Sequence, residues 1–179
     1  MLERKINRGE AVSLETRTSV WDSVSRLDQT LLTGAHVHFP GLAGQLLIMD
    51  DQISDEDRAI VFIRSREALE NALKREPANT FAWARLAWFM YLQDGPSPDS
   101  LEALKMSIYS APAKKSLLFW RISFAALHRA YWDQDFENLL KRQIYFARRV
   151  SSSRLAQVAA QAGLEDLVQE TLENSPAGG

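Results

Sequence analysis

The amino-acid sequence predicts an all-α protein built from antiparallel helix pairs that stack into a short α-solenoid. The main observation is an internal repeat, in which Ala68 and Pro77 recur as Ala103 and Pro112, each 35 residues later. A period in the mid-thirties, helical on both sides of a proline turn, is typical of stacked helix pairs. The second observation is that no segment shows the sustained apolar–polar alternation of a β-strand.

The repeat continues into the helix that follows each proline turn. With one residue added in the turn, residues 81–88 align with residues 117–124, so that Arg85 corresponds to Arg121. The first of these helices is apolar on every side except at Arg85. That pattern favours a central helix over a superficial one.

Length and composition narrow the class of protein. A chain of 179 residues forms one domain, or one domain with an arm, and its hydrophobic fraction of 46% is enough for a core. A net charge of -2 gives no general attraction for nucleic acid, and the lack of cysteine excludes disulfides and thiol catalysis. The first residues lack the apolar stretch of a signal peptide, so we expect a cytoplasmic protein.

Residues 1–53 are expected to form an N-terminal arm, a helix over about 19–33 and a loop. Residues 29–49 carry no charge and have the length of a membrane span, but several Gly, His and Pro residues interrupt them. A buried loop that joins two helices is the expected structure. Residues 54–176 are expected to form the helical repeat domain.

Helix signals divide that domain into seven segments. Ser54 is placed to cap the first helix and Asn79 the second, while Pro77, Pro112 and Gly163 fall at helix ends. In the first helix we expect five apolar residues to face inward: Ile60, Ile63, Leu69, Ala72 and Leu73. The expected helices cover residues 55–76, 80–93, 99–111, 115–131, 134–150, 153–162 and 164–174.

The repeat resembles the tetratricopeptide repeat (TPR). Trp83, Leu86, Ala87 and Met90 stand at the spacing of the TPR pattern W-x2-L-G-x2-Y, and Pro77 ends the preceding helix where the TPR has its proline. The likeness covers residues 58–131 and continues weakly to residue 176. Alanine stands where the pattern has glycine and methionine where it has tyrosine, so helix pairs of another solenoid type stay open.

The resemblance implies a binding groove. Arg85 and Arg121 occupy a position that lines the concave face of TPR domains, where some members use a basic residue to grip a C-terminal carboxylate. Phe81 and Trp88 stand at groove positions where such a clamp would have polar side chains. The alternative is that both arginines pair within the protein, with Glu70 or Glu102 as candidates.

A second candidate site is a basic docking face on the 134–150 helix. Lys141, Arg142, Tyr145, Arg148 and Arg149 share one face at helical spacing, and the opposite face is apolar: Phe136, Leu139, Leu140, Ile144, Ala147 and Val150. Such a face could dock an acidic partner or an anionic membrane surface. The alternative is a solvated helix surface.

No motif indicates catalysis, a metal or a cofactor. The spacing of His36 and His38 near Asp50 and Asp51 is too weak to indicate a metal site, and His128 is interpreted as a histidine at the edge of the core. The sequence has no Gly-rich phosphate loop, no G-x-S-x-G and no H-E-x-x-H. We therefore expect no catalytic residue, no metal and no cofactor.

The expected function is that of a non-enzymatic TPR-like adaptor or scaffold subunit that binds another protein within a larger assembly. The partner is expected to offer an acidic surface or peptide, and nucleic acid is not expected. The alternative is a peripheral membrane or polyanion binder that uses the basic helix, and a small enzyme is the third interpretation.

Overall fold

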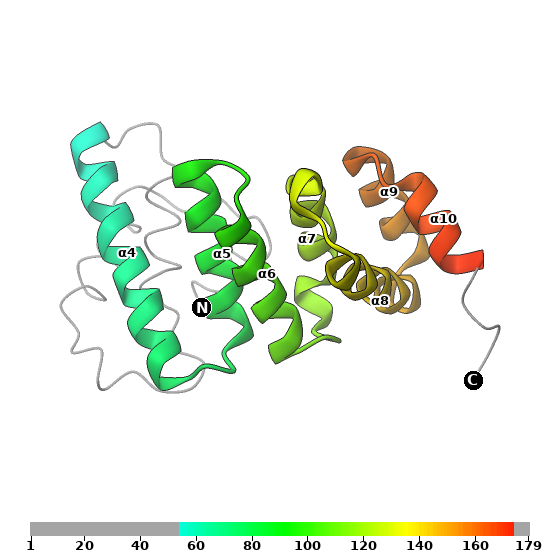
Figure 1. Cartoon of the computed structure of the whole chain (residues 1–179), viewed down its shortest axis with the longest axis horizontal. Coiled ribbons are helices and arrows are strands. Elements are labelled where there is room, and N and C mark those ends of the chain that lie inside the picture. Colours follow the sequence, from blue (N-terminus) through cyan, green and yellow to red (C-terminus); the bar gives the residue numbers. More distant parts are fainter. Residues whose placement is uncertain (1–53, 174–179) are drawn as a thin grey trace. The chain divides into compact units, whose positions relative to one another are not determined.

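A computed structural model of the chain describes residues 54–173, in which every regular element is helical (Figure 1). In this range there are seven α-helices, one short 3-10 helix and no strand, which confirms the expected all-α class. The α-helices are α4 (Asp55–Arg75), α5 (Thr80–Asp94), α6 (Pro98–Ser110), α7 (Lys115–Ala126), α8 (Gln134–Val150), α9 (Ser152–Ala162) and α10 (Glu165–Glu173). The expectations for residues 1–53 and beyond residue 173 lie outside the described residues.

The chain divides into two compact units, and the boundary falls within α5, after Phe89. In the first unit, α4 and α5 form a helical hairpin whose turn contains Pro77 (Figure 1). The Trp83 indole N–H donates to the carbonyl of Pro77 at 2.7 Å, and the rings of Phe62 and Phe89 meet with centroids 5.4 Å apart. These contacts join the two helices at the turn and farther along their length.

Both expected caps of this hairpin are confirmed. The Ser54 hydroxyl accepts from the Asp57 N–H at 3.1 Å, and the Asn79 side-chain oxygen accepts from the Ala82 N–H at 3.1 Å. Each oxygen satisfies an N–H group that has no partner within its helix. The capping residue alone was therefore enough to predict where each helix starts.

The inward face of α4 differs from the expectation at two residues. Ile60 and Ile63 are 43% and 57% exposed, so their predicted burial is wrong, whereas Leu69, Ala72 and Leu73 are buried as expected. The buried stripe also contains three residues that the expectation left out, Val61 and the small residues Ser65 and Ala68. Close packing selects for size as well as apolarity, so small side chains took the buried positions.

In the second unit, α6 begins at a capping box. Ser97 and Ser100 each accept a hydrogen bond from the backbone N–H of the other, and Pro98 stands in the first turn. The helix therefore begins at Pro98, before the expected start at Asp99 or Ser100. Gly95, with φ of 72°, takes the left-handed conformation that ends α5.

The helix α7 is shorter than the expected 115–131 segment. It ends at Ala126, after which a 3-10 helix covers Arg129–Tyr131. The N–H of Leu127 bonds to the carbonyl of Phe124 three residues back, which is the tighter 3-10 pattern. The change in hydrogen bonding ends the α-helix although the helical pattern of apolar residues continues.

The core of the second unit lies where α7, α8 and α9 meet. In this unit α7 packs against α8 and α9, and α10 packs against α8 and α9. The fully buried large side chains here include Phe136, Ile122, Leu140, Ile144 and Leu155. Gly163, with φ of 63°, makes the break between α9 and α10 that the sequence predicts.

The pattern of buried residues follows the 35-residue repeat. Five buried positions of α4 recur as buried positions of α6, 35 residues later: Ser65 and Ser100, Ala68 and Ala103, Leu69 and Leu104, Ala72 and Ser107, Leu73 and Ile108. In α5 and α7 the correspondence is partial. Leu86 and Ile122 are both buried, but Ala87 is buried where Ser123 is exposed.

Candidate functional site

Arg121 lies inside the second unit, with no part of its surface exposed. Its guanidinium donates to the Ser107 hydroxyl and carbonyl, to the Ala111 carbonyl at 3.0 Å and to the Gln143 side-chain oxygen at 3.2 Å. The Gln143 amide in turn donates to the carbonyl of Pro112 at 2.8 Å. One side chain of α7 therefore connects α6, the turn after it and α8.

This environment favours the alternative in which Arg121 bonds within the protein. The partners named above are carbonyl, hydroxyl and amide oxygens, while the two carboxylates considered as candidates bond other residues, Glu70 to Arg66 and Glu102 to Lys105. Burial lowers the pKa of Arg121 to about 10, so the guanidinium keeps its charge at neutral pH. Arg121 does not line a groove in this structure.

The other three groove residues lie on α5 in the first unit. Phe81, Arg85 and Trp88 are spaced four and three residues apart, which puts them on one face of the helix, and each is half-buried. The Arg85 guanidinium lies 6.0 Å from the centre of the Phe81 ring. The Trp88 ring meets the Phe89 ring edge-on at 5.5 Å. The structure brings these three residues together, and Arg121 belongs to the other unit.

The basic docking face of α8 is exposed except at Lys141. Lys141 pairs with Glu170 of α10 at 2.8 Å, and this hydrogen bond raises the pKa of Lys141. Arg142, Arg148 and Arg149 are exposed, and Tyr145 is 36% exposed. We call Arg142, Tyr145, Arg148 and Arg149 the arginine face. Within residues 54–173 no carboxylate lies in ion-pair range of its three arginines.

Two features of the sequence place the arginine face outward. The opposite side of α8 is buried as expected at Phe136, Leu139, Leu140, Ile144 and Ala147, which fixes the rotation of the helix. Val150 differs from the expectation, since it is 41% exposed. Gln143 is buried on the same side, where it bonds Arg121. Arg148 and Arg149 also stand in the last turn of α8, where the helix dipole favours cations.

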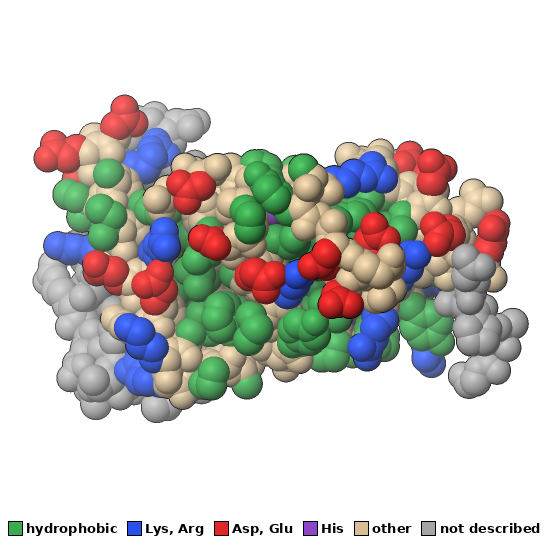
Figure 2. Space-filling model, viewed as in Figure 1, with side chains coloured by type: hydrophobic (Ala, Val, Ile, Leu, Met, Phe, Trp, Pro, Cys, Tyr) green, Lys and Arg blue, Asp and Glu red, His purple; other side chains and the backbone are tan. Residues whose placement is uncertain are grey.

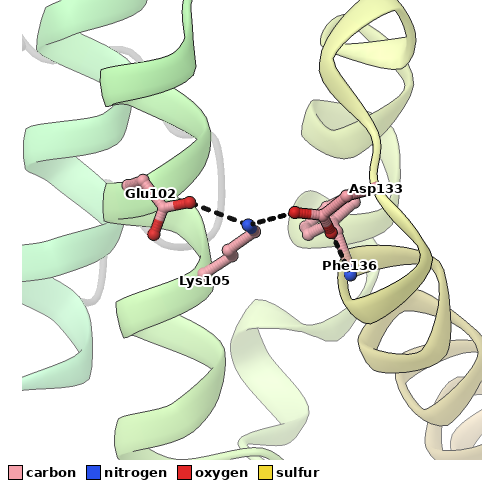
Figure 3. A network of polar contacts seen from close by, with 4 residues as sticks. All are labelled: Glu102, Lys105, Asp133 and Phe136. Atoms are coloured by element: carbon pink, nitrogen blue, oxygen red, sulfur yellow. Dashed lines mark hydrogen bonds and ion pairs between the residues drawn. The ribbon is translucent and has the colours of Figure 1, made fainter.

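A polar network joins α6 to the start of α8 (Figure 3). Lys105 bonds Glu102 at 2.7 Å and Asp133 at 3.1 Å, and Asp133 accepts from the Phe136 N–H at 2.7 Å as the N-cap of α8. Burial acts to lower the pKa of Lys105, but the bonds to both carboxylates outweigh it and raise the pKa. The bonds from Phe136 and Lys105 lower the pKa of Asp133. The network is a connection between helices.

Sequence reasoning missed a buried pair between Ser100 and His128. The Nδ1 of His128 lies 3.0 Å from the Phe124 carbonyl, which can only accept, so Nδ1 carries the proton. The Ser100 hydroxyl contacts Nε2 and is also within hydrogen-bond distance of the Ser97 carbonyl. A serine activated by a histidine is a nucleophile in many enzymes. Here both side chains are completely buried, so no substrate reaches the hydroxyl. The two residues are 28 apart in sequence, and no motif signals the pair.

Metal-binding clusters and membrane-spanning helices are both absent from the described part of the chain. Among residues 54–173 no cluster of three or more His, Asp or Glu side chains is arranged to hold a metal ion. None of the helices in this range combines the length and the apolar character that crossing a bilayer requires.

Of the residues singled out from the sequence, Phe81, Arg85 and Trp88 are thus half-buried on one face of α5, and the arginine face is exposed on α8. Compared with models of protein families, with curated proteins and with solved structures, this chain matches none.

Proposed function

We propose that this protein is a non-enzymatic adaptor or scaffold subunit, built from TPR-like helix pairs, that binds another protein within a larger assembly. The observation that carries the proposal is the shared pattern of burial in α4 and α6 at a spacing of 35 residues. Helix-pair repeats bury one face against their neighbours and leave another for partners. Proteins built from such repeats usually bind other proteins.

The polar groups of the described residues support binding over catalysis. The side chains that would suit chemistry best, Ser100, Arg121 and His128, are completely buried and take part in internal hydrogen bonds. The exposed cations of α8 are instead open to solvent. They suit recognition of a charged surface.

A peripheral membrane or polyanion binder is the second candidate function, and the exposed arginines of α8 are the observation that favours it. Helices that lie in a membrane interface insert an apolar face into the lipid. The apolar face of α8 is used in the core, where Phe136, Leu140 and Ile144 have no exposed surface. At α8 only electrostatic attraction would then hold the protein on a membrane, and we rank this function second.

The test is capture of partners by the full-length chain from an extract of its own cells, followed by reconstitution with the purified partner. An adaptor is expected to form a complex of fixed stoichiometry, measured by size-exclusion chromatography with light scattering. Failure to form any such complex, together with turnover in a screen of small-molecule substrates, would instead identify an enzyme. Binding to anionic vesicles alone would identify the second candidate.

A further inference from the structure

The arginine face of α8 carries an inference about the chemistry of the partner. Its three arginines are exposed, and no carboxylate within residues 54–173 is paired with them. By contrast, Lys141 on the same helix and Lys105 on α6 both have carboxylate partners. Three of the exposed cations of this unit that have no carboxylate partner among the described residues therefore share one side of α8.

We propose that the arginine face binds a short acidic segment of a partner protein, through two or three Asp or Glu side chains. The inference rests on the proposed adaptor function and names the partner's chemistry. Arg142 and Arg149 are seven residues apart, so they stand on one side of the helix about 10 Å apart. This separation matches carboxylates a few residues apart in a peptide.

The residue types suit carboxylates. A guanidinium can bind a carboxylate through two parallel N–H···O bonds, a geometry that lysine lacks. The Arg149 guanidinium lies 5.8 Å from the centre of the Tyr145 ring. Contact between a cation and an aromatic ring holds the side chain near one position and leaves the edge of the guanidinium for a ligand.

The surroundings of the arginine face favour a short segment over an extended polyanion. α10 packs against α8 and carries four exposed acids: Glu165, Asp166, Glu170 and Glu173. Figure 2 shows red side chains over α10 and blue side chains at the edge of α8. A membrane or a nucleic acid that extended from the arginines over α10 would meet these acids and be repelled. A short peptide avoids them.

The test is fluorescence anisotropy of a short, labelled peptide of alternating Glu and Ser, titrated with the full-length protein at low and at high salt. The test variant is Arg142→Gln, Arg148→Gln, Arg149→Gln. The control variant is Arg64→Gln, Lys74→Gln, Lys115→Gln, which removes the same charge from exposed positions on other helices. Circular dichroism of each variant reports that the fold is kept.

We expect the wild-type protein to bind the acidic peptide and the α8 variant to bind it about tenfold more weakly, since each exposed ion pair contributes modestly. The control variant should bind like wild type, and high salt should reduce the difference. An equal loss of peptide affinity in both variants would mean that only net charge matters, and it would overturn the proposal. So would unchanged binding in the α8 variant, or no peptide binding alongside binding to phosphatidylserine vesicles or single-stranded DNA.

These outcomes are distinct from failure of the adaptor function. A partner complex that forms equally well with wild type and the α8 variant overturns this inference and leaves the adaptor proposal standing. Peptide binding without any partner complex leaves the acidic preference standing and counts against the adaptor.

Discussion

Arg121 is the largest side chain that the described residues bury completely. A buried charge is costly unless hydrogen bonds surround it, and Arg121 has partners on α6, on the following turn and on α8. At the scale of single residues, Arg121 connects α6, the turn after it and α8 through hydrogen bonds to oxygen atoms of all three segments.

Replacement of Arg121 with methionine should lower the free energy of unfolding by about 3 kcal/mol, because the buried Gln143 side-chain oxygen would lose the donor that Arg121 supplies. Urea denaturation followed by circular dichroism measures the loss. Arg121→Lys is the informative companion, since it keeps the charge but loses the fork of donors. An unchanged urea midpoint for Arg121→Met would show that the network adds no stability.

His128 should make stability depend on pH. Burial lowers its pKa, and the hydrogen bond to the Phe124 carbonyl opposes that effect only in part. Above pH of about 6.5 the imidazole is neutral in the folded and unfolded chains. As the pH decreases below this value, His128 is protonated in the unfolded chain before it is protonated in the folded chain. The free energy of unfolding therefore decreases as the pH is lowered, until His128 is protonated in the folded chain too. Thermal unfolding of wild type and His128→Gln across this range should give a flatter profile for the variant, and parallel profiles would contradict the assignment.

At the scale of helices, corresponding positions of the repeat have different surroundings. Ala87 of α5 has no exposed surface, whereas Ser123 of α7 is exposed and bonds only the Phe119 carbonyl of its own helix. A small residue is required where another helix comes close. The requirement applies at Ala87 and not at Ser123.

Ala87→Leu should therefore overpack the first unit and cost about 1–3 kcal/mol, while Ser123→Leu should change stability by no more than about 0.5 kcal/mol. The two substitutions introduce the same side chain, so each is the control for the other. Thermal melts of both variants against wild type make the comparison. Equal losses at the two positions would mean that Ser123 is packed as tightly as Ala87.

At the scale of the whole molecule, charge is separated along the chain. Residues 113–150 hold eight Lys and Arg against three Asp and Glu, while residues 151–179 hold one against four. The basic helix α8 and the acidic helix α10 pack together, and the pair between Lys141 and Glu170 joins them. This contact reduces the charge that α8 offers to a partner.

Glu170→Gln should release Lys141 and strengthen binding of the acidic Glu–Ser peptide about twofold at low salt, the effect of one exposed charge. Anisotropy titration of the full-length variant measures it. Glu173→Gln removes an equal charge from an acid that has no contact with Lys141, and its gain should be smaller. Equal gains from the two substitutions would mean that only net charge matters.

Local patterns predicted the elements well. The caps at Ser54 and Asn79 and the break at Gly163 act within a few residues, so the sequence places them directly. The arginine face could also be predicted, because the spacing of apolar residues along α8 fixes which side is buried. The end of α7 could not, because apolar periodicity runs past the residue where the hydrogen bonding changes.

The sequence by itself determined the all-α class, the positions of the helices, the 35-residue repeat and the outward side of α8. Only the tertiary structure decided the burial and the hydrogen-bond partners of Arg121, Ser100 and His128. Each of them bonds a partner that is distant along the chain, at separations of 10 to 28 residues. Burial at such positions depends on which helices pack together, and the neighbouring residues in the sequence do not indicate this. Arginine at equivalent repeat positions could therefore lie half-buried on α5 and fully buried on α7.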